Sequence, residues 1–142
     1  MKNGQKKKKI EVTEALLKSL PKTDLHCHLD GSLRLETILE LADKHSVKLP
    51  ATNADQLAKA IHMGEICTDL PAYLKAFDIT CSVLQTADAL ERVSYELVKD
   101  AAEENVWHLE VRYAPVLHTL RGLSLARIVE SVLAGLQAGE RD

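Results

Sequence analysis

Aromatic side chains are scarce in this sequence, because one Trp, three Tyr and one Phe make up only 4% of the chain. A buried core must therefore be built from Leu, Ile, Val and Ala. No apolar run approaches the ~20 residues that cross a bilayer, so no membrane helix and no membrane partner are predicted. With only 6 Gly and 4 Pro, the composition excludes a collagen-like chain.

Cysteine and net charge are also low. The three cysteines, Cys27, Cys67 and Cys81, form no CxxC pair, which argues against a disulfide framework and predicts a reducing compartment, the cytoplasm. A formal net charge of −3 gives no overall attraction to nucleic acid, so no nucleic-acid partner is expected. Hydrophobic residues at 46% and charged residues at 27% are ordinary for a globular domain.

The chain begins with a basic run that contains neither arginine nor interleaved aromatics. We interpret residues 1–12 as a disordered, solvated tail and residues 13–142 as part of one globular domain. Hydrophobic periodicity predicts helices over residues 14–20, 34–46, 53–63, 69–84, 87–105 and 124–138, and strands over 23–29 and 106–113. The last helix is expected to bury Leu125, Ile128, Val129, Val132, Leu133 and Leu136.

The order of these elements predicts an α/β fold. Strand followed by helix, occurring twice, indicates a parallel sheet with crossover helices. About 75 residues separate the strands, more than one crossover helix needs, so helices 53–63 and 69–84 are interpreted as an insertion in a functional loop. Two parallel strands are too few for a stable sheet. We therefore expect the N-terminal portion of a larger α/β protein.

The end of the first predicted strand carries a compact polar motif, DLHCHLDG. Residues i and i+2 of a strand share a face, so His26 and His28 project together while Cys27 points the other way. Two imidazoles on a strand end provide half of a site for Zn²⁺ or Fe²⁺. Asp24 and Asp30 fall on the same face by parity. Spacing alone leaves a metal site and structural histidines both open.

The motif has a wider context. Residues 20–34, LPKTDLHCHLDGSLR, resemble the first barrel strand and loop of the adenosine deaminase family of metal-dependent amidohydrolases. Residues 70–74 with Phe77 resemble the helix over that family's nucleoside pocket, 109–115 resemble its second strand, and 135–142 resemble the end of its second barrel helix. The resemblance implies an incomplete N-terminal part of a TIM (β/α)8 barrel, with a helical lid inserted between the first two strands.

The resemblance also implies zinc-dependent hydrolytic deamination of adenosine to inosine, a step of purine salvage with a small-molecule nucleoside as substrate. His26 and His28 match the family's first two zinc ligands, and His28 also lies near substrate there. Asp30 matches the acid that hydrogen-bonds the ribose 5′-hydroxyl. The apolar residues that cover the pocket are matched by Leu70, Tyr73, Leu74 and Phe77.

The family's remaining ligands and catalytic groups lie on later strands, so no catalytic residue is assigned in this chain and they are expected beyond Asp142. Two ligands hold zinc poorly, so the 142-residue chain by itself is expected to be inactive. Two alternatives stay open. One is deamination of another adenine-containing nucleoside or base, and the other is a truncated, non-catalytic interaction module.

Several other residues receive structural roles. Glu110 and Arg112 share a face of the second strand; substrate contact is one interpretation, and a buried structural ion pair is the favoured one. Residues 30–32, Asp-Gly-Ser, are predicted to form a turn, in which Gly31 is able to take a positive φ. Cys67 and Cys81 are interpreted as small buried apolar groups. The histidines without ligand spacing, expected at the surface, are His45, His62 and His118.

Overall fold

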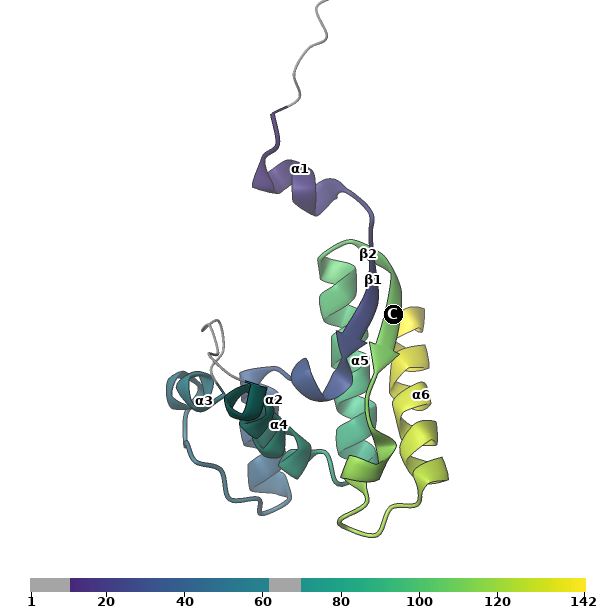
Figure 1. Ribbon diagram of the computed structural model, residues 1–142. Coiled ribbons are helices and arrows are strands. Elements are labelled where there is room, and N and C mark those ends of the chain that lie inside the picture. Colours follow the sequence, from purple (N-terminus) through teal and green to yellow (C-terminus); the bar gives the residue numbers. More distant parts are fainter. Residues whose placement is uncertain (1–10, 62–69) are drawn as a thin grey trace, which may run out of the picture.

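A computed structural model of the chain describes residues 11–61 and 70–142. Each helix and strand that the sequence predicts is present there (Figure 1). The predicted features at residues 1–10, His62 and Cys67 lie outside the described residues. The elements in chain order are α1 (Glu14–Ser19), β1 (Lys22–His28), η1 (Leu29–Gly31), α2 (Leu35–Lys44), α3 (Ala54–Ala60), α4 (Leu70–Val83), α5 (Ala87–Glu103), β2 (Val106–Arg112), η2 (Pro115–His118) and α6 (Leu125–Arg141).

Side-chain caps define where several helices begin. The hydroxyl of Thr13 accepts a hydrogen bond from the Leu16 amide at 3.2 Å and so begins α1. The Asn53 side chain accepts from the Gln56 amide at 3.0 Å at the start of α3. Ser124 caps α6 in the same way. Each cap satisfies a backbone donor that the helix leaves unpaired, so these boundaries are local properties of the sequence.

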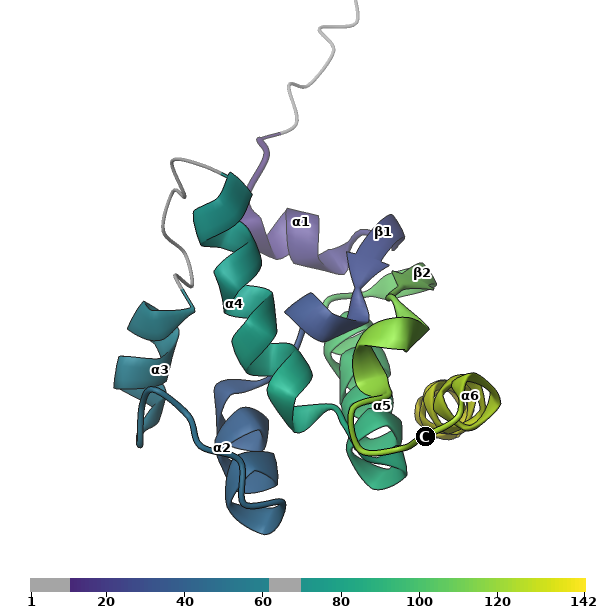
Figure 2. The ribbon, with the colours of Figure 1, turned by 60° about the horizontal axis from the view of Figure 1, so that its bottom comes forward.

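The two strands form a parallel pair, as predicted. Lys22 lies opposite Val106, and His28 lies opposite Arg112. The helices α5 and α6 pack against one another along the sheet, while α2, α3 and α4 lie beside the C-terminal end of β1 (Figure 1). Figure 2 shows α4 beside η1, the turn that follows β1. The crossover therefore brings its extra helices to the strand end that carries the histidine motif.

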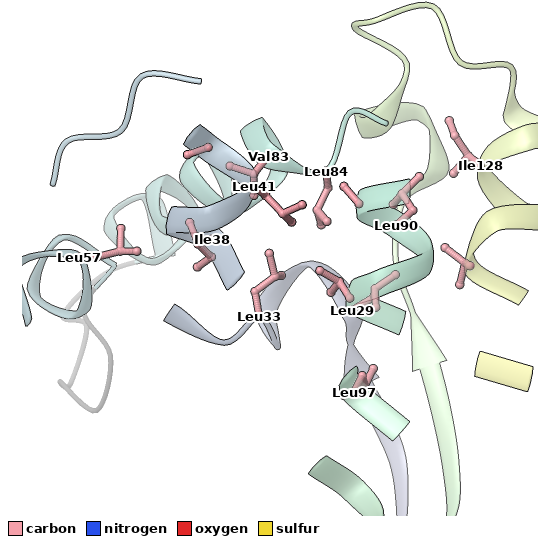
Figure 3. Close-up of a cluster of buried hydrophobic side chains, with 14 of the residues drawn as sticks. Leu29, Leu33, Ile38, Leu41, Leu57, Val83, Leu84, Leu90, Leu97 and Ile128 are labelled. Carbon is pink, nitrogen blue, oxygen red and sulfur yellow. The ribbon is translucent and has the colours of Figure 1, made fainter. Parts of the chain in front are cut away.

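The core is purely aliphatic, which confirms the prediction drawn from the shortage of aromatic residues. It begins at η1 and runs through the crossover helices to α6 (Figure 3). None of the helices among the described residues is both long and apolar enough to span a membrane. The buried apolar residues are Leu29, Leu33, Ile38, Leu41, Ala42, Ala51, Leu57, Val83, Leu84, Ala89, Leu90, Val93, Leu97, Ile128 and Val132.

Two glycines allow α5 and α6 to approach closely. A Cβ atom at position 135 would lie 2.1 Å from the Glu91 carbonyl oxygen, and one at position 139 would lie 2.7 Å from Val98 Cβ. Such distances are far below van der Waals contact, so only glycine fits at this crossing.

The predicted apolar stripe of α6 is only partly buried. Ile128 and Val132 are fully enclosed, as expected. Leu125, Val129 and Leu133 are exposed instead, with 55%, 39% and 49% of their surface accessible. Their prediction as buried residues was wrong for the described structure, because no described element covers this face of α6.

Candidate functional site

The histidine pair lies at the C-terminal end of β1. The strand directs His26 and His28 to one face, and their Nε2 atoms are 3.1 Å apart. Their ring centroids are separated by 5.1 Å with an interplanar angle of 45°. Cys27 is half-buried and packs against the core on the other side. Strand alternation thus brings the two imidazoles together in the way the sequence predicts.

The spacing of the two nitrogens fits a shared metal ion. Zn–N bonds are about 2.0–2.1 Å long, so two imidazole nitrogens on one tetrahedral zinc lie about 3.3 Å apart. The observed Nε2 separation of 3.1 Å is close to that value, and it also suits an N–H···N hydrogen bond between the rings. Within residues 11–61 and 70–142, no group of three or more His, Cys, Asp or Glu side chains is arranged to hold a metal. His26 and His28 therefore fit two of the four donors of a zinc site.

Asp30 follows the pair within the turn η1. Only 4% of its surface is exposed, and among the described residues its Oδ1 atom has no hydrogen-bond partner. The Nδ1 atom of His28 lies 3.6 Å from Oδ1, too far for a hydrogen bond. The Ser32 hydroxyl donates to the His28 carbonyl at 2.6 Å and holds the turn. A buried carboxylate oxygen without a donor is destabilising, so this atom is ready to accept a hydrogen bond from a ligand.

A cavity of about 100 Å³ lies beside this carboxylate. Phe77 of α4 forms one wall, and its ring meets His28 edge-on with centroids 6.2 Å apart. A Cβ atom on Gly31 would lie 3.3 Å from Phe77 Cζ. The residues around the cavity are Asp30, Gly31, Ile61, Ala76, Phe77 and Thr80.

Gly31 therefore serves close packing. The predicted turn is present, but Gly31 does not use a positive φ; Gly122 is the glycine with a positive φ, 84°, in the described part of the chain. Gly31 lies within the η1 turn, where the missing side chain lets Phe77 approach the end of β1. The apolar wall of the cavity depends on that approach.

The four residues predicted to cover the pocket behave differently from one another. Phe77 is half-buried at the cavity. Leu70 and Leu74 are exposed, at 66% and 51%, and they do not line it. The side chain of Tyr73 lies outside the described part of the structure. The structure therefore joins Phe77 to His28 and Asp30 and leaves the first turns of α4 open.

The neighbouring strand β2 also carries polar groups on its exposed face. Arg112 Nη2 lies 3.3 Å from Glu110 Oε2, so the predicted ion pair forms. The two side chains are 50% and 48% exposed, however, so its burial was predicted wrongly. The pair is accessible because, among the described residues, no element packs over that face of the sheet. His108 Nε2 is 3.8 Å from Glu110.

Two histidines predicted at the surface lie inside. His118 in η2 is completely buried, and burial lowers the pKa of its imidazole. His45 is largely buried, with its Nε2 3.2 Å from the Thr86 hydroxyl. Both predictions were wrong, because each histidine lies in a turn whose burial depends on packing that periodicity does not reveal. Cys81, predicted as a buried apolar group, is half-buried. Burial, and to a smaller extent the negative charges of Asp30 and Asp78, raise the pKa of its thiol to about 11.

Fold and site together define the class: an α/β chain with a parallel strand pair, in which paired histidines lie where the first strand ends. The family model described as adenosine deaminase matches residues 21–142. The chain therefore belongs to the adenosine deaminase family.

Two curated relatives illustrate the match. A "Probable adenosine deaminase" of Dictyostelium discoideum is 49% identical over 130 residues, which cover 92% of this chain and 17% of the relative. An "Adenosine deaminase" of Vibrio vulnificus is 50% identical over 121 residues, which cover 85% of this chain and 37% of the relative. This chain thus spans 37% or less of the length of these two relatives.

Solved structures show the same partial coverage. An amidohydrolase from Burkholderia ambifaria with bound zinc matches with a TM-score of 0.77 and 28% identity, over 94% of this chain and 36% of that one. Adenine deaminase from Arthrobacter aurescens gives a TM-score of 0.75 and 30% identity, over 86% and 36%. Arabidopsis ADAL complexed with GMP gives 0.66 and 29%, over 90% and 37%.

Proposed function

We propose that the protein acts as a zinc-dependent adenosine deaminase that converts adenosine and water to inosine and ammonia. The observation that carries this proposal is the convergence of His26 Nε2 and His28 Nε2, 3.1 Å apart, at the strand end that Asp30 follows. Membership of the adenosine deaminase family supports the reaction, and the zinc in the related Burkholderia ambifaria structure supports the metal. The proposed place of the reaction is purine salvage.

The two imidazoles supply part of the metal coordination. His26 and His28 each present Nε2 on the same face of β1. The Nδ1 atom of His28 lies 3.6 Å from the Asp30 carboxylate, and Nε2 is the ring nitrogen that faces His26. When bound, zinc lowers the pKa of a coordinated water, so that water becomes a nucleophile near neutral pH.

The cavity beside Asp30 suits one end of a nucleoside. Drug-sized ligands occupy pockets of about 300–1,000 Å³, whereas the space here is about 100 Å³. It matches a fragment the size of a hydroxymethyl group. Asp30 Oδ1 would accept the hydrogen bond of the ribose 5′-hydroxyl, and Phe77 would shield that contact from water.

The lid proposal is separate from the cavity. Leu70, Tyr73, Leu74 and Phe77 would cover the nucleoside from α4, with Phe77 already at the site. Leu70 and Leu74 are exposed without a ligand, and a nucleoside bound between α4 and β1 would cover their side chains. The helices α3 and α4 would form this inserted lid.

We also propose that residues 13–142 contribute the first two βα units of a (β/α)8 barrel. The parallel pair of β1 and β2 supports this, as does the 37% or less of the two curated relatives that the chain spans. The further zinc ligands and the proton-transferring groups would come from other strands of that barrel. On its own, the 142-residue chain is expected to lack deaminase activity, since two ligands do not hold zinc firmly.

The cytoplasm is the proposed compartment, in keeping with the free thiols of Cys27 and Cys81. Adenosine is the preferred candidate substrate, with neither nucleic acid nor membrane as a partner. The curated relatives at 49% and 50% identity are named adenosine deaminase, whereas the adenine deaminase structure is 30% identical. Adenine carries no sugar hydroxyl to pair with Asp30, so a preference for adenine would leave that carboxylate without a role.

The test uses the full native protein, treated with a chelator and then supplied with zinc. Deamination of adenosine should fall on chelation and return with zinc, and adenine should react far more slowly. The compound 5′-deoxyadenosine, which lacks only the proposed partner of Asp30, should show a KM raised about tenfold, the size expected for one lost hydrogen bond. Activity that is indifferent to chelation, or a preference for adenine, would contradict the proposal.

A further inference from the structure

The backbone of β1 departs from regular pairing at the histidine motif. Its register with β2 shifts between Asp24 and Cys27, the stretch that contains His26. Here the Asp24 carboxylate accepts a hydrogen bond from the His26 amide at 3.0 Å. Arg112 Nη2 donates to the Leu25 carbonyl at 3.4 Å. Such irregularities re-aim side chains, so the direction of the His26 ring depends on the bond that Asp24 supplies.

The second histidine is held from the other end of the motif. The Ser32 hydroxyl donates to the His28 carbonyl at 2.6 Å, and the Ser32 amide donates to the Leu29 carbonyl at 3.2 Å. The hydroxyl has one proton, so the Cys27 thiol, 3.4 Å from Ser32 Oγ, is the donor in that contact. Cys27 in turn packs against the aliphatic core. Ser32 therefore ties the backbone of His28 to the η1 turn and to the core.

The Asp24 carboxylate acts on the backbone, although strand parity places it on the face of the two histidines. In the part of the chain that the structure describes, no three His, Cys, Asp or Glu side chains are arranged to hold a metal, so Asp24 does not join His26 and His28 as a third ligand. Its Oδ1 atom accepts from the amide two residues further on, which is the contact of an Asx turn. Asp24 thus shapes the strand that carries the pair.

We propose that Asp24 and Ser32 are positioning residues for the histidine pair, each holding the backbone of one metal ligand so that the two Nε2 atoms converge. The role rests on the proposed function, in which His26 and His28 bind zinc. With the backbone held, only the side-chain torsions of each histidine remain to be fixed when a metal binds. The Nε2 separation of 3.1 Å is the outcome of these two anchors. Such preorganisation raises affinity by lowering the entropy that binding removes.

The first test measures zinc affinity in the full native protein by competition with a chromogenic chelator. Asp24→Ala and Ser32→Ala should each raise the Kd for zinc about tenfold, the size expected for one lost hydrogen bond. Asp24→Asn keeps an oxygen acceptor and Ser32→Thr keeps a hydroxyl donor, so both should stay within about threefold of wild type. An unchanged Kd in either alanine variant would overturn the role of that residue.

The asparagine variant separates positioning from coordination. Asp24→Asn keeps the side-chain oxygen that accepts from the His26 amide and removes the negative charge. If Asp24 bound zinc directly or acted through its charge, Asp24→Asn would weaken zinc binding by tenfold or more. That result would overturn the positioning role, and so would a tenfold loss in Ser32→Thr. The two conservative variants therefore decide the matter where an alanine variant does not fold.

Matched controls lose a bond of the same kind at α6. Ser124→Ala removes the oxygen that accepts from the Arg127 amide at 3.2 Å, and Ser131→Ala removes the hydroxyl that donates to the Arg127 carbonyl at 2.8 Å. Both controls should leave the Kd for zinc within about twofold of wild type, whatever they do to stability in urea. A tenfold rise in Kd in the controls as well would show a general effect of stability and would overturn the positioning role.

Zinc affinity and deaminase activity together separate this inference from the proposed function. If adenosine is not deaminated but zinc binds more weakly to the alanine variants, the proposed function fails and the positioning role stands. If adenosine is deaminated with zinc and the alanine variants bind zinc as tightly as wild type, the proposed function stands and the positioning role is overturned.

Discussion

The ends of β1 and β2 lie side by side and present polar side chains to the same open face, yet they are equipped differently. On β2, Glu110 and Arg112 lie 3.3 Å apart and neutralise each other. On β1, the Nε2 atoms of His26 and His28 face each other 3.1 Å apart. The Glu110 carboxylate already has the Arg112 guanidinium as its counter-ion, whereas two imidazole nitrogens can bind a metal ion through their lone pairs. The comparison separates a structural surface from a ligand-binding one.

The largest expected effect comes from removing a ring of the β1 pair. In the full native protein, His26→Ala or His28→Ala should abolish zinc retention and lower kcat/KM for adenosine about 10³-fold or more, because metal activation of water supplies several kcal/mol. His108→Ala on β2 removes a third exposed histidine from the same face and should stay within about twofold of wild type. Metal analysis and steady-state kinetics measure both. Equal losses of zinc and of kcat/KM in His28→Ala and His108→Ala would contradict the assignment of the metal site to β1.

The next effect concerns the helices beneath both strands. Gly135→Ala places a Cβ 2.1 Å from the Glu91 carbonyl oxygen and should lower the free energy of unfolding by about 2–3 kcal/mol. Gly122→Ala meets open space and should lower it by about 1 kcal/mol, through the strain of φ at 84°. Urea denaturation measures both changes. Similar values for the two variants would show that the α5–α6 crossing is looser than the structure indicates.

A smaller, pH-dependent effect is expected at His118 behind β2. Burial lowers the pKa of this histidine below its ordinary 6.5, so the folded protein resists a proton that the unfolded chain accepts. Stability should therefore be unaffected above pH 6.5 and should fall as the pH drops below it, by no more than about 1.4 kcal/mol per pH unit. His118→Asn should flatten that decline between pH 6.5 and 5, and His108→Asn should leave it. Urea denaturation midpoints measured between pH 6.5 and 5 test this expectation. An equal decline in His118→Asn and wild type would contradict it.

The smallest effect should come from the ion pair of β2. Glu110→Gln is expected to lower the free energy of unfolding by about 0.2–1 kcal/mol, because both partners are half-exposed and solvent screens their attraction. Zinc content should not change. A double-mutant cycle with Arg112→Met measures the coupling. A clear drop in zinc content in Glu110→Gln would show that β2 takes part in the metal site after all.

Much of the site was predictable because its geometry is local. Alternation along one strand is enough to place His26 and His28 on the same face, and a turn directly after the strand is enough to bring Asp30 near them. The caps at Thr13, Asn53 and Ser124 are likewise settled within three residues. Phe77 and Gly31 were singled out from the sequence, but their mutual contact was not, because it joins residues far apart in the chain.

The errors share one cause. His118 was expected at the surface, and Leu125 and Leu133 were expected to be buried, because helical or turn position was taken to predict exposure. Burial depends on what packs against a segment, and neither Gln85 beneath η2 nor the close glycine contact of α6 leaves a periodic signal. No spacing rule identifies Gln85 either, although it makes three buried hydrogen bonds.

By itself, the sequence determined the order of the elements, the parallel pairing of two strands and the convergence of two imidazoles at the end of the first. The imidazoles converge because side chains alternate along a strand, and the parallel pairing follows from the strand–helix–strand order of the chain. Only the tertiary structure decided that Phe77 borders the Asp30 cavity, that His118 is buried behind β2 and that half of the α6 stripe remains open. Those outcomes depend on packing between segments that lie tens of residues apart in the chain, where small residues and hydrogen-bonded turns set how closely two elements approach.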